Sequence, residues 1–285
     1  MVTLSFEERL ADVLDRMSPA EQRVARYFQG NRQEVLIASA AALAEKAETS
    51  DATVVRTVRT LGYSGLDELR NTLSPAERLT RTLGEVGGSL AAAFDLTLDI
   101  HLGSLESLRR TIPPELFEEA VDGIAGARRT VVFGLGPSNS IANYLVVQLG
   151  RFGLDVLALT NTGLLFADDL QRLREGDLVI MLAYGRVYAE LAVLLDEIKR
   201  RGLRSYLVTD TLAAVLRRRV DLVLPVARGR ADMLSMHTAT LGFVEALLVG
   251  IGVKRPDATL AGLKALNEAR IRLAGDKVGL PVTES

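Results

Sequence analysis

The spacing of hydrophobic residues changes near residue 130 of this 285-residue chain. Before that point, apolar side chains recur every three or four positions, as they do on one face of an α-helix. After it, short runs of consecutive apolar residues, such as Val131-Val132-Phe133, alternate with amphipathic stretches. Continuous apolar runs are typical of parallel strands that helices cover on both faces. The pattern predicts an all-α N-terminal part followed by a three-layer α/β domain.

The C-terminal pattern predicts a five-stranded parallel sheet with helices between its strands. The strands are expected near residues 131–133, 156–159, 178–181, 206–208 and 222–224. The helices are expected near residues 140–152, 164–173, 188–201, 212–218 and 234–251. We therefore divide the chain into a helical domain at 1–75, a helical linker at 76–112, an α/β domain at 113–275 and a tail at 276–285.

Residues 40–61 have the pattern of two short helices joined by a tight polar turn. Residues 40–47 are mostly small and apolar, and Ser50 is placed to cap the helix that follows the turn. The expected buried face of that second helix consists of Val54, Val55, Val58 and Leu61. This arrangement is a helix-turn-helix, in which the second helix can lie in the major groove of DNA.

The other face of the second helix carries hydroxyl and guanidinium groups that can reach phosphates and base edges. The candidate DNA contacts are Lys46, Ser50, Thr53, Arg56, Thr57, Arg59 and Thr60. Charge adds little support, because residues 1–73 hold 9 Lys and Arg against 11 Asp and Glu, without the basic footprint of a strong non-specific binder. A helical bundle with a solvated polar face is the alternative. Specific binding is expected to need a local basic cluster and two copies held together.

The same region carries landmarks whose spacing agrees with a known family. They are residues 18–28 (SPAEQRVARYF), Ala44-Glu45, residues 50–56 (SDATVVR) and residues 61–66 (LGYSGL). Within the first, Ser18, Pro19 and Glu21 also fit a capping box at the start of a helix. These landmarks resemble the N-terminal domain of RpiR-type bacterial transcription regulators. The resemblance implies a regulator that binds double-stranded operator DNA.

A glycine-rich loop, GLGPSNS at residues 134–140, leads from the first expected strand straight into a helix. Ligands of open parallel sheets bind beyond the carboxyl ends of the strands, and glycines let the backbone approach them. A helix N-terminus also attracts anions. The loop is not the dinucleotide fingerprint, which would need glycine in place of Asn139, and the chain has no Walker motif.

The segment from about Thr130 to Gly252, with its Gly-x-Gly-x-Ser loop and Thr209-Asp210 strand end, resembles the sugar-isomerase (SIS) domain. This phosphosugar-binding module follows the helix-turn-helix in RpiR-type regulators. The resemblance implies that Ser138 helps to hold a sugar phosphate. The loop after the third strand normally supplies a Ser-x-Ser-Gly-x-Thr cradle. Residues 182–187 (LAYGRV) lack both serines and the threonine.

Arg186 is expected to supply an anion clamp in place of the missing hydroxyls, with a solvated loop arginine as the alternative. The candidate effector-binding residues are Gly136, Ser138, Asn139, Ser140, Tyr184, Arg186 and His237. The effector is expected to be a phosphosugar or a related anion. An unrelated acidic or polyol ligand, or a domain kept only for assembly, stays open.

An enzyme is the second hypothesis, a sugar-phosphate isomerase with a helical N-terminal extension. Isomerisation needs a base close to the sugar carbons. His237 and Glu245 are the candidates, but neither has the flanking pattern of a catalytic residue. A fused helix-turn-helix favours sensing over turnover, so we predict a regulator and not an enzyme.

Composition excludes several other classes of function. The chain has no cysteine and only two histidines, His101 and His237, so neither thiol chemistry nor a histidine-rich metal site is expected, and no cofactor is predicted. The most apolar run, residues 241–253, is too short for a membrane span and contains Glu245. No signal peptide is recognised. We expect a cytoplasmic protein.

Assembly is expected to depend on residues after about Ala76. This region has a loose apolar stripe formed by Leu79, Leu83, Leu90, Phe94, Leu98, Leu102 and Leu105. Gly84 and Gly87-Gly88 interrupt it and are expected to mark a hinge. We predict a homodimer or homotetramer in which the ligand shifts a population between subunit arrangements.

Overall fold

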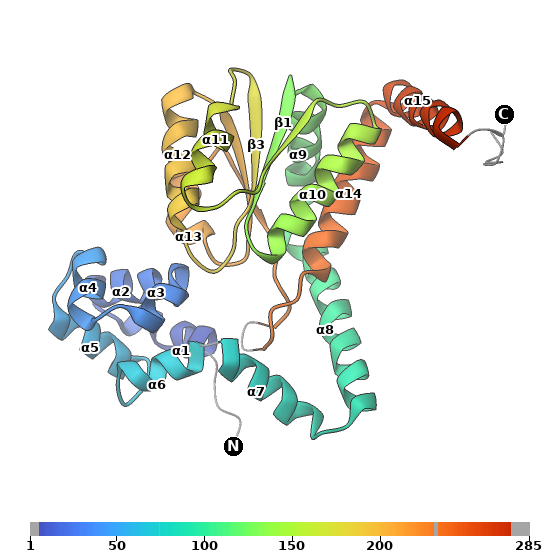
Figure 1. The fold of residues 1–285 in the computed structure, drawn as a ribbon. Helices are drawn as coiled ribbons and strands as arrows, with labels where there is room; N and C mark the ends of the chain where they lie inside the picture. The colour runs from blue at the N-terminus through green and yellow to red at the C-terminus, as the bar shows by residue number, and fades with distance from the viewer. Residues whose placement is uncertain (1–5, 74, 231–232, 275–285) are drawn as a thin grey trace.

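The computed structural model describes residues 6–73, 75–230 and 233–274. Its N-terminal part is a bundle of short helices (Figure 1). They are α1 (Phe6–Val13), the 3-10 turn η1 (Leu14–Arg16), α2 (Pro19–Gly30), α3 (Arg32–Ile37), α4 (Ala40–Lys46), α5 (Asp51–Thr60) and α6 (Leu66–Leu73). Helices α4 and α5 form the predicted helix-turn-helix.

Serine caps begin three of these helices. Ser18 and Glu21 form the predicted capping box, in which each side chain accepts the backbone N–H of the other residue and Pro19 takes the first helical position. Ser39 caps α4, and the Ser50 hydroxyl accepts the Thr53 N–H at 3.3 Å at the start of α5. A serine cap satisfies a backbone donor that the helix itself leaves unpaired. These boundaries therefore follow from local sequence.

Two long helices connect the bundle to the α/β domain. Helix α7 (Pro75–Val86) ends at Gly87 and Gly88, whose φ angles are +58° and +78°, and α8 (Leu90–Thr111) begins after the cap at Ser89. The predicted hinge therefore lies at this glycine pair, because left-handed backbone favours glycine. Helix α7 continues through Gly84. Figure 1 shows α7 and α8 as two arms of a bend below the sheet.

The C-terminal domain is built on a five-stranded parallel sheet, as predicted. The strands are β1 (Arg129–Gly134), β2 (Val156–Leu159), β3 (Asp177–Leu182), β4 (Arg204–Thr209) and β5 (Leu222–Pro225). Their order is β2-β1-β3-β4-β5, and every neighbouring pair is parallel. The chain leaves β1 toward one side for β2 and returns to its other side for β3. This reversal makes the carboxyl end of β1 the switch point where such sheets bind ligands.

Helices cover both faces of the sheet. One face holds α9 (Pro114–Gly126), α10 (Pro137–Arg151) and α14 (Thr238–Lys254). The other holds α11 (Phe166–Gln171), α12 (Ala189–Arg201) and α13 (Ala213–Leu216), flanked by the turns η2 (Gly163–Leu165) and η3 (Arg217–Arg219). Neighbouring residues alternate between the faces, since Val131 packs in one core and Val132 in the other. Helix α15 (Pro256–Ala274) follows α14.

The last predicted helix begins later than expected. We predicted helix from residue 234, but α14 starts at Thr238. In the segment before it, the Leu234 N–H donates to the Thr82 hydroxyl of α7 at 3.0 Å, and the Met236 N–H donates to the Arg228 carbonyl. The predicted tail at 276–285 lies outside the described residues. Among those that are described, no helix is long and apolar enough to cross a membrane.

The strand ends of the sheet face the N-terminal bundle and α7 (Figure 1). Helix α2 packs against α13 closely enough that a Cβ atom on Gly30 would lie 2.5 Å from Cγ2 of Val215. The Arg230 guanidinium pairs with Glu85 of α7 at 2.9 Å. The carboxyl edge of the sheet is therefore covered by helices from the other half of the chain.

Candidate functional site

Helix α5 presents a narrower polar face than its sequence suggested. Arg56 and Arg59 are exposed as predicted, but Thr53 is only 9% exposed and Thr57 is fully buried. The Thr57 hydroxyl donates to the Thr53 carbonyl at 2.8 Å. Both threonines are buried because α5 packs against α2 as well as α4. The expectation that they face DNA is corrected: Val55, placed on the buried side, is instead 41% exposed.

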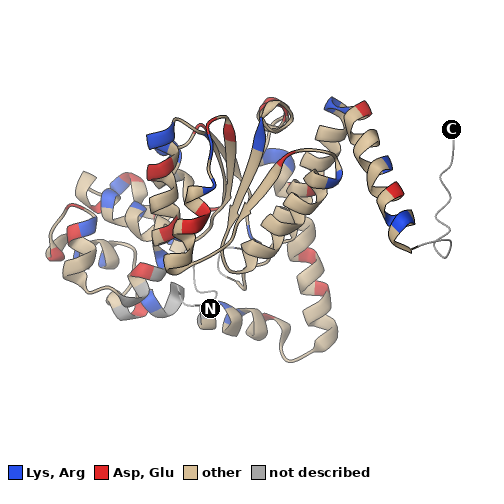
Figure 2. Cartoon of the chain, turned by 45° about the horizontal axis from the view of Figure 1, so that its top comes forward, with Lys and Arg blue, Asp and Glu red and all other residues tan. Residues whose placement is uncertain are grey.

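The other candidate contacts of this domain have structural partners. The Thr60 hydroxyl donates to Glu21 at 2.9 Å and so ties α5 to the capping box of α2. Lys46 forms an ion pair with Glu34 of α3. Ser50 is the cap of α5. Figure 2 shows Lys and Arg interspersed with Asp and Glu over these helices. The exposed basic groups of α5 are thus Arg56 and Arg59.

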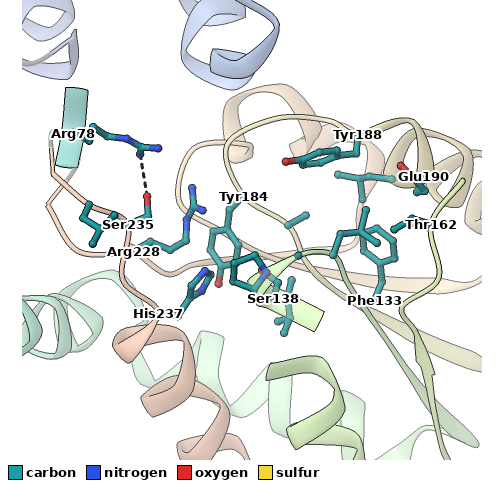
Figure 3. A pocket seen from close by; sticks show the side chains of 17 residues that line it. Arg78, Phe133, Ser138, Thr162, Tyr184, Tyr188, Glu190, Arg228, Ser235 and His237 are labelled. Carbon is teal, nitrogen blue, oxygen red and sulfur yellow. Dashed lines mark hydrogen bonds between the residues drawn. The ribbon is translucent and has the colours of Figure 1, made fainter. Parts of the chain in front are cut away.

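A cavity of about 520 Å³ lies at the carboxyl edge of the sheet (Figure 3). Its polar lining comes from α7, from the segments that follow β1, β2, β3 and β5, and from Glu190 of α12. Their main contributions are Arg78, Gly136, Ser138, Tyr184, Tyr188, Arg228, Ser235 and His237. This volume suits a small organic molecule. The structure therefore has a cavity at the predicted switch point, and α7 of the helical half of the chain also lines it.

The glycine loop after β1 has the expected shape. A Cβ atom on Gly134 would lie 2.6 Å from the Ser138 carbonyl oxygen, and Gly136 has φ +55°. The loop turns on itself, because the Ser138 N–H donates to the Leu135 carbonyl and the Asn139 N–H to that of Gly136. These two amides are therefore engaged within the loop, whereas we expected the helix start to offer free amides to an anion.

Four of the seven predicted effector residues line the cavity: Gly136, Ser138, Tyr184 and His237. Three do not. The Asn139 side chain donates to the Thr160 carbonyl at 3.3 Å, and Ser140 is exposed. Arg186 lies 4.1 Å from the centroid of the Tyr188 ring, and its charge acts on Glu34 of α3. The expected position is corrected: the Arg186 side chain does not line the cavity but lies by Tyr188.

Tyr184 lies in the loop that follows β3. Its hydroxyl pairs with that of Thr240 at 2.8 Å, and its ring meets the His237 ring edge-on with 5.5 Å between centroids. Burial raises the pKa of the Tyr184 phenol. Burial, followed by the nearby Arg228 charge, lowers the pKa of His237 to about 4. Both side chains are therefore uncharged at neutral pH.

The basic groups of the cavity are two arginines that sequence analysis missed. Arg228 pairs with Asp210 at 2.9 Å and lies 4.7 Å from the centroid of the Tyr184 ring. Arg78 donates to the Ser235 hydroxyl at 2.9 Å (Figure 3). Burial, and then the charge of Arg228, lowers the pKa of Arg78. Neither arginine is marked by a local sequence pattern, because Asp210 and Ser235 lie far from Arg228 and Arg78 respectively along the chain.

The described residues include no group of three or more His, Asp or Glu side chains that could hold a metal ion. Ser138, Ser235 and His237 instead provide neutral hydrogen-bonding groups beside the two arginines. A cavity of this kind can recognise a small anion with polar substituents.

The fold and the site define a class of protein: an N-terminal helix-turn-helix domain joined to a sugar-isomerase-like α/β domain. Residues 4–84 match the model of the helix-turn-helix domain of the rpiR family, and residues 123–250 match that of the SIS domain. The two matches cover more than two thirds of the chain. The chain belongs to the RpiR family.

Two relatives differ in what they share with the chain. The chain is 28% identical over 261 residues to the HTH-type transcriptional regulator HexR of Pseudomonas aeruginosa. That match covers 87% of this chain and 89% of HexR. The chain is 27% identical over 282 residues to the bifunctional protein glk of Burkholderia orbicola. That match covers 95% of this chain but only 43% of the relative, so the chain spans less than half of that protein.

Solved structures agree with the fold. The sugar isomerase domain of an RpiR transcription factor from Sphaerobacter thermophilus is 27% identical with a TM-score of 0.54, and the match covers 59% of this chain and 94% of that one. The Vibrio vulnificus NanR protein complexed with ManNAc-6P is 22% identical with a TM-score of 0.60, over 95% of this chain and 100% of that one. The second match supports the two-domain fold.

Proposed function

We propose that this protein is a DNA-binding transcriptional regulator whose α/β domain senses a small anionic metabolite related to sugars. The proposal of DNA binding rests on Arg56 and Arg59, which are exposed on the second helix of a helix-turn-helix. A helix in this position can present its side chains to the major groove. HexR, similar over most of its length, is named a transcriptional regulator. Such a protein acts on chromosomal DNA, so we expect it in the cytoplasm.

A mobility-shift assay with DNA from upstream of the protein's own gene tests this function. Specific binding should survive competition by unrelated DNA and should weaken in the Arg56→Ala variant. Binding that unrelated DNA removes equally well would contradict a regulator of this type.

The effector half of the proposal is supported by the cavity at the carboxyl edge of the sheet. The solved structure of NanR, which has a similar fold, is of that protein complexed with ManNAc-6P. Here the hydroxyl cradle is replaced, and the basic groups are Arg78 and Arg228. We therefore expect an anion, with a ligand set that differs from the hydroxyl-rich one. Ligand binding would shift the population of regulator states that differ in operator affinity.

Assembly into a homodimer or homotetramer is supported by exposed apolar side chains on α8. Leu90 is 88% exposed, and Phe94 and Leu102 are each 65% exposed. Contiguous exposed apolar patches of this kind mark protein–protein contacts. Two half-sites in an operator also require two recognition helices. Sedimentation of the full chain and of Phe94→Glu tests this: the variant should dissociate toward a monomer.

A sugar-phosphate isomerase is the second candidate, because two groups able to accept protons, His237 and Glu190, line the same cavity. Figure 3 places them on opposite sides of it. The Glu190 carboxylate also accepts the Gly163 N–H at 3.0 Å. Turnover of phosphorylated aldoses or ketoses, lost in His237→Gln, would favour the enzyme over the regulator.

A further inference from the structure

The cavity at the sheet edge is shared between the two halves of the chain. Arg78 lies on α7, within the segment that matches the helix-turn-helix family model, and Arg228 lies within the segment that matches the SIS domain. Both line the cavity, and Figure 3 shows their side chains approaching it from the same side. A molecule that touched both guanidinium groups would therefore bridge the two halves directly.

In the part of the chain that the structure describes, several arginines gather at this edge of the sheet. Among the described residues, the guanidinium groups of Arg32, Arg78 and Arg228 act on one another, and the Asp210 carboxylate acts on all three. Arg32 has its own partner in Glu7 of α1. Arg78 is held by a neutral hydroxyl, that of Ser235, and its Nε atom is buried without a hydrogen-bond partner. Like charges held close together in a partly buried site disfavour one another.

An anion in the cavity would relieve this repulsion. Arg228 uses Nε to pair with Asp210, and Arg78 uses Nη1 to hold Ser235. A guanidinium carries five N–H donors, so each group keeps donors for a carboxylate or phosphate. His237 is uncharged at neutral pH and can act as a neutral hydrogen-bonding partner. Glu190 lines the opposite wall, so the charged end of a ligand belongs beside the arginines.

We propose that the cavity binds a small organic anion whose carboxylate or phosphate group is held between Arg78 of α7 and Arg228 of the α/β domain, so that the ligand clamps the helical half of the chain onto the sheet. This proposal deepens the proposed function, because it rests on the same cavity being the effector site. Its consequence is that ligand binding fixes α7 and, with it, the orientation of the helix-turn-helix. In this proposal, Arg78 and Arg228 hold the anion in place of the serine and threonine hydroxyls that residues 182–187 lack.

The test is calorimetric titration of the full chain, without DNA, by three six-carbon probes: glucose 6-phosphate, gluconate and uncharged sorbitol. At least one of the two anions should bind, and sorbitol should not. Arg78→Gln should weaken anion binding at least tenfold, as should the double variant Arg228→Gln/Asp210→Asn, which removes both charges of the ion pair. The matched control is Arg230→Gln. It breaks another contact between α7 and the same loop, the pair with Glu85, but does not line the cavity.

Hydrogen exchange supplies the second readout. In the wild type, the bound anion should slow exchange of the α7 amides, and Arg78→Gln should abolish that protection at saturating ligand. If Arg228→Gln/Asp210→Asn weakened anion binding but Arg78→Gln did not, the clamp would be overturned. The anion would then be held within the α/β domain. Equal binding of sorbitol, or no binding by any probe, would also overturn the clamp.

The same preparations separate this proposal from the regulator itself. DNA binding with no anion clamp would refute only the clamp. An anion clamp in a protein that binds no DNA specifically would refute only the proposed regulator.

Discussion

Two pairs of arginines meet opposite environments in this protein. Arg56 and Arg59 are exposed on α5, whereas the Arg228 side chain is only 19% exposed beside Asp210, and Arg78 is half-buried. An exposed guanidinium is hydrated and screened by salt, so it suits an extended polyanion that brings many weak contacts. A buried one has lost much of its water and is held in place, so it suits one small anion in a cavity. Burial, more than residue type, separates the two roles.

The largest effect should come from removing a buried arginine without its partner. Arg228→Ala should lower the free energy of unfolding by roughly 3 kcal/mol. It leaves the Asp210 carboxylate, 18% exposed, without its guanidinium. Urea denaturation measures this, and Arg228→Ala/Asp210→Asn should recover part of the loss. Arg59→Ala is the exposed counterpart and should change stability by less than about 0.5 kcal/mol. Equal losses from both single variants would remove the distinction between the pairs.

The exposed pair should matter for DNA and not for stability. Arg56→Ala should cost roughly 1–3 kcal/mol of specific DNA binding if the side chain contacts a base pair. The melting temperature should stay close to that of the wild type. Arg26→Ala, an exposed arginine on α2, is the matched control and should leave operator affinity nearly unchanged. Unaltered affinity in Arg56→Ala would mean that the contact lies elsewhere.

Salt should separate the two kinds of anion binding. Affinity for DNA should fall steeply as salt rises, because phosphate contacts release counterions, and loss of one phosphate contact lowers the logarithmic slope by about 1. Affinity for the small anion should fall less, since partly buried charges are screened less. Fluorescence anisotropy for DNA and calorimetry for the small anion, each repeated over a series of salt concentrations, give the two slopes. Equal slopes would show that the cavity arginines behave as surface groups.

The smallest effect concerns His237, which shares the cavity with the buried pair. Its pKa is lowered from 6.5 to about 4 by burial and by Arg228, so the folded protein favours the neutral ring. The stability that this ring contributes is fully present above pH 6.5 and is lost as pH falls through about 4. Urea midpoints at pH 7.5 and pH 5 should therefore differ less in His237→Gln than in the wild type. An unchanged difference would assign the pH effect to other groups.

The exposed pair could be found from sequence, and the buried pair could not. Arg56 and Arg59 lie on a helix whose start is set by Ser50 and whose end is set by Gly62, all within a dozen residues. Even there, the sequence placed Thr57 on the wrong face, because α5 packs against α2 as well as its neighbour α4. Helical periodicity predicts one buried face for a helix, but packing against a second helix buries a wider part of its surface.

The cavity depended on segments that are far apart along the chain. Its glycine loop and His237 were predicted, since each follows a recognisable strand. Arg78 bonds to Ser235 across 157 positions, so no local pattern could pair them. Arg186 was expected in the cavity, yet its guanidinium lies over the Tyr188 ring and acts on Glu34 of α3.

The sequence by itself determined the helix caps, the helix-turn-helix, the five parallel strands and the switch point, because those depend on hydrogen bonds and apolar periodicity among near neighbours. Only the tertiary structure decided that α7 closes over the strand ends and that Arg78 and Arg228 share one cavity. That choice comes from packing between the two halves of the chain. A local stretch of sequence carries no record of which distant surface will cover it.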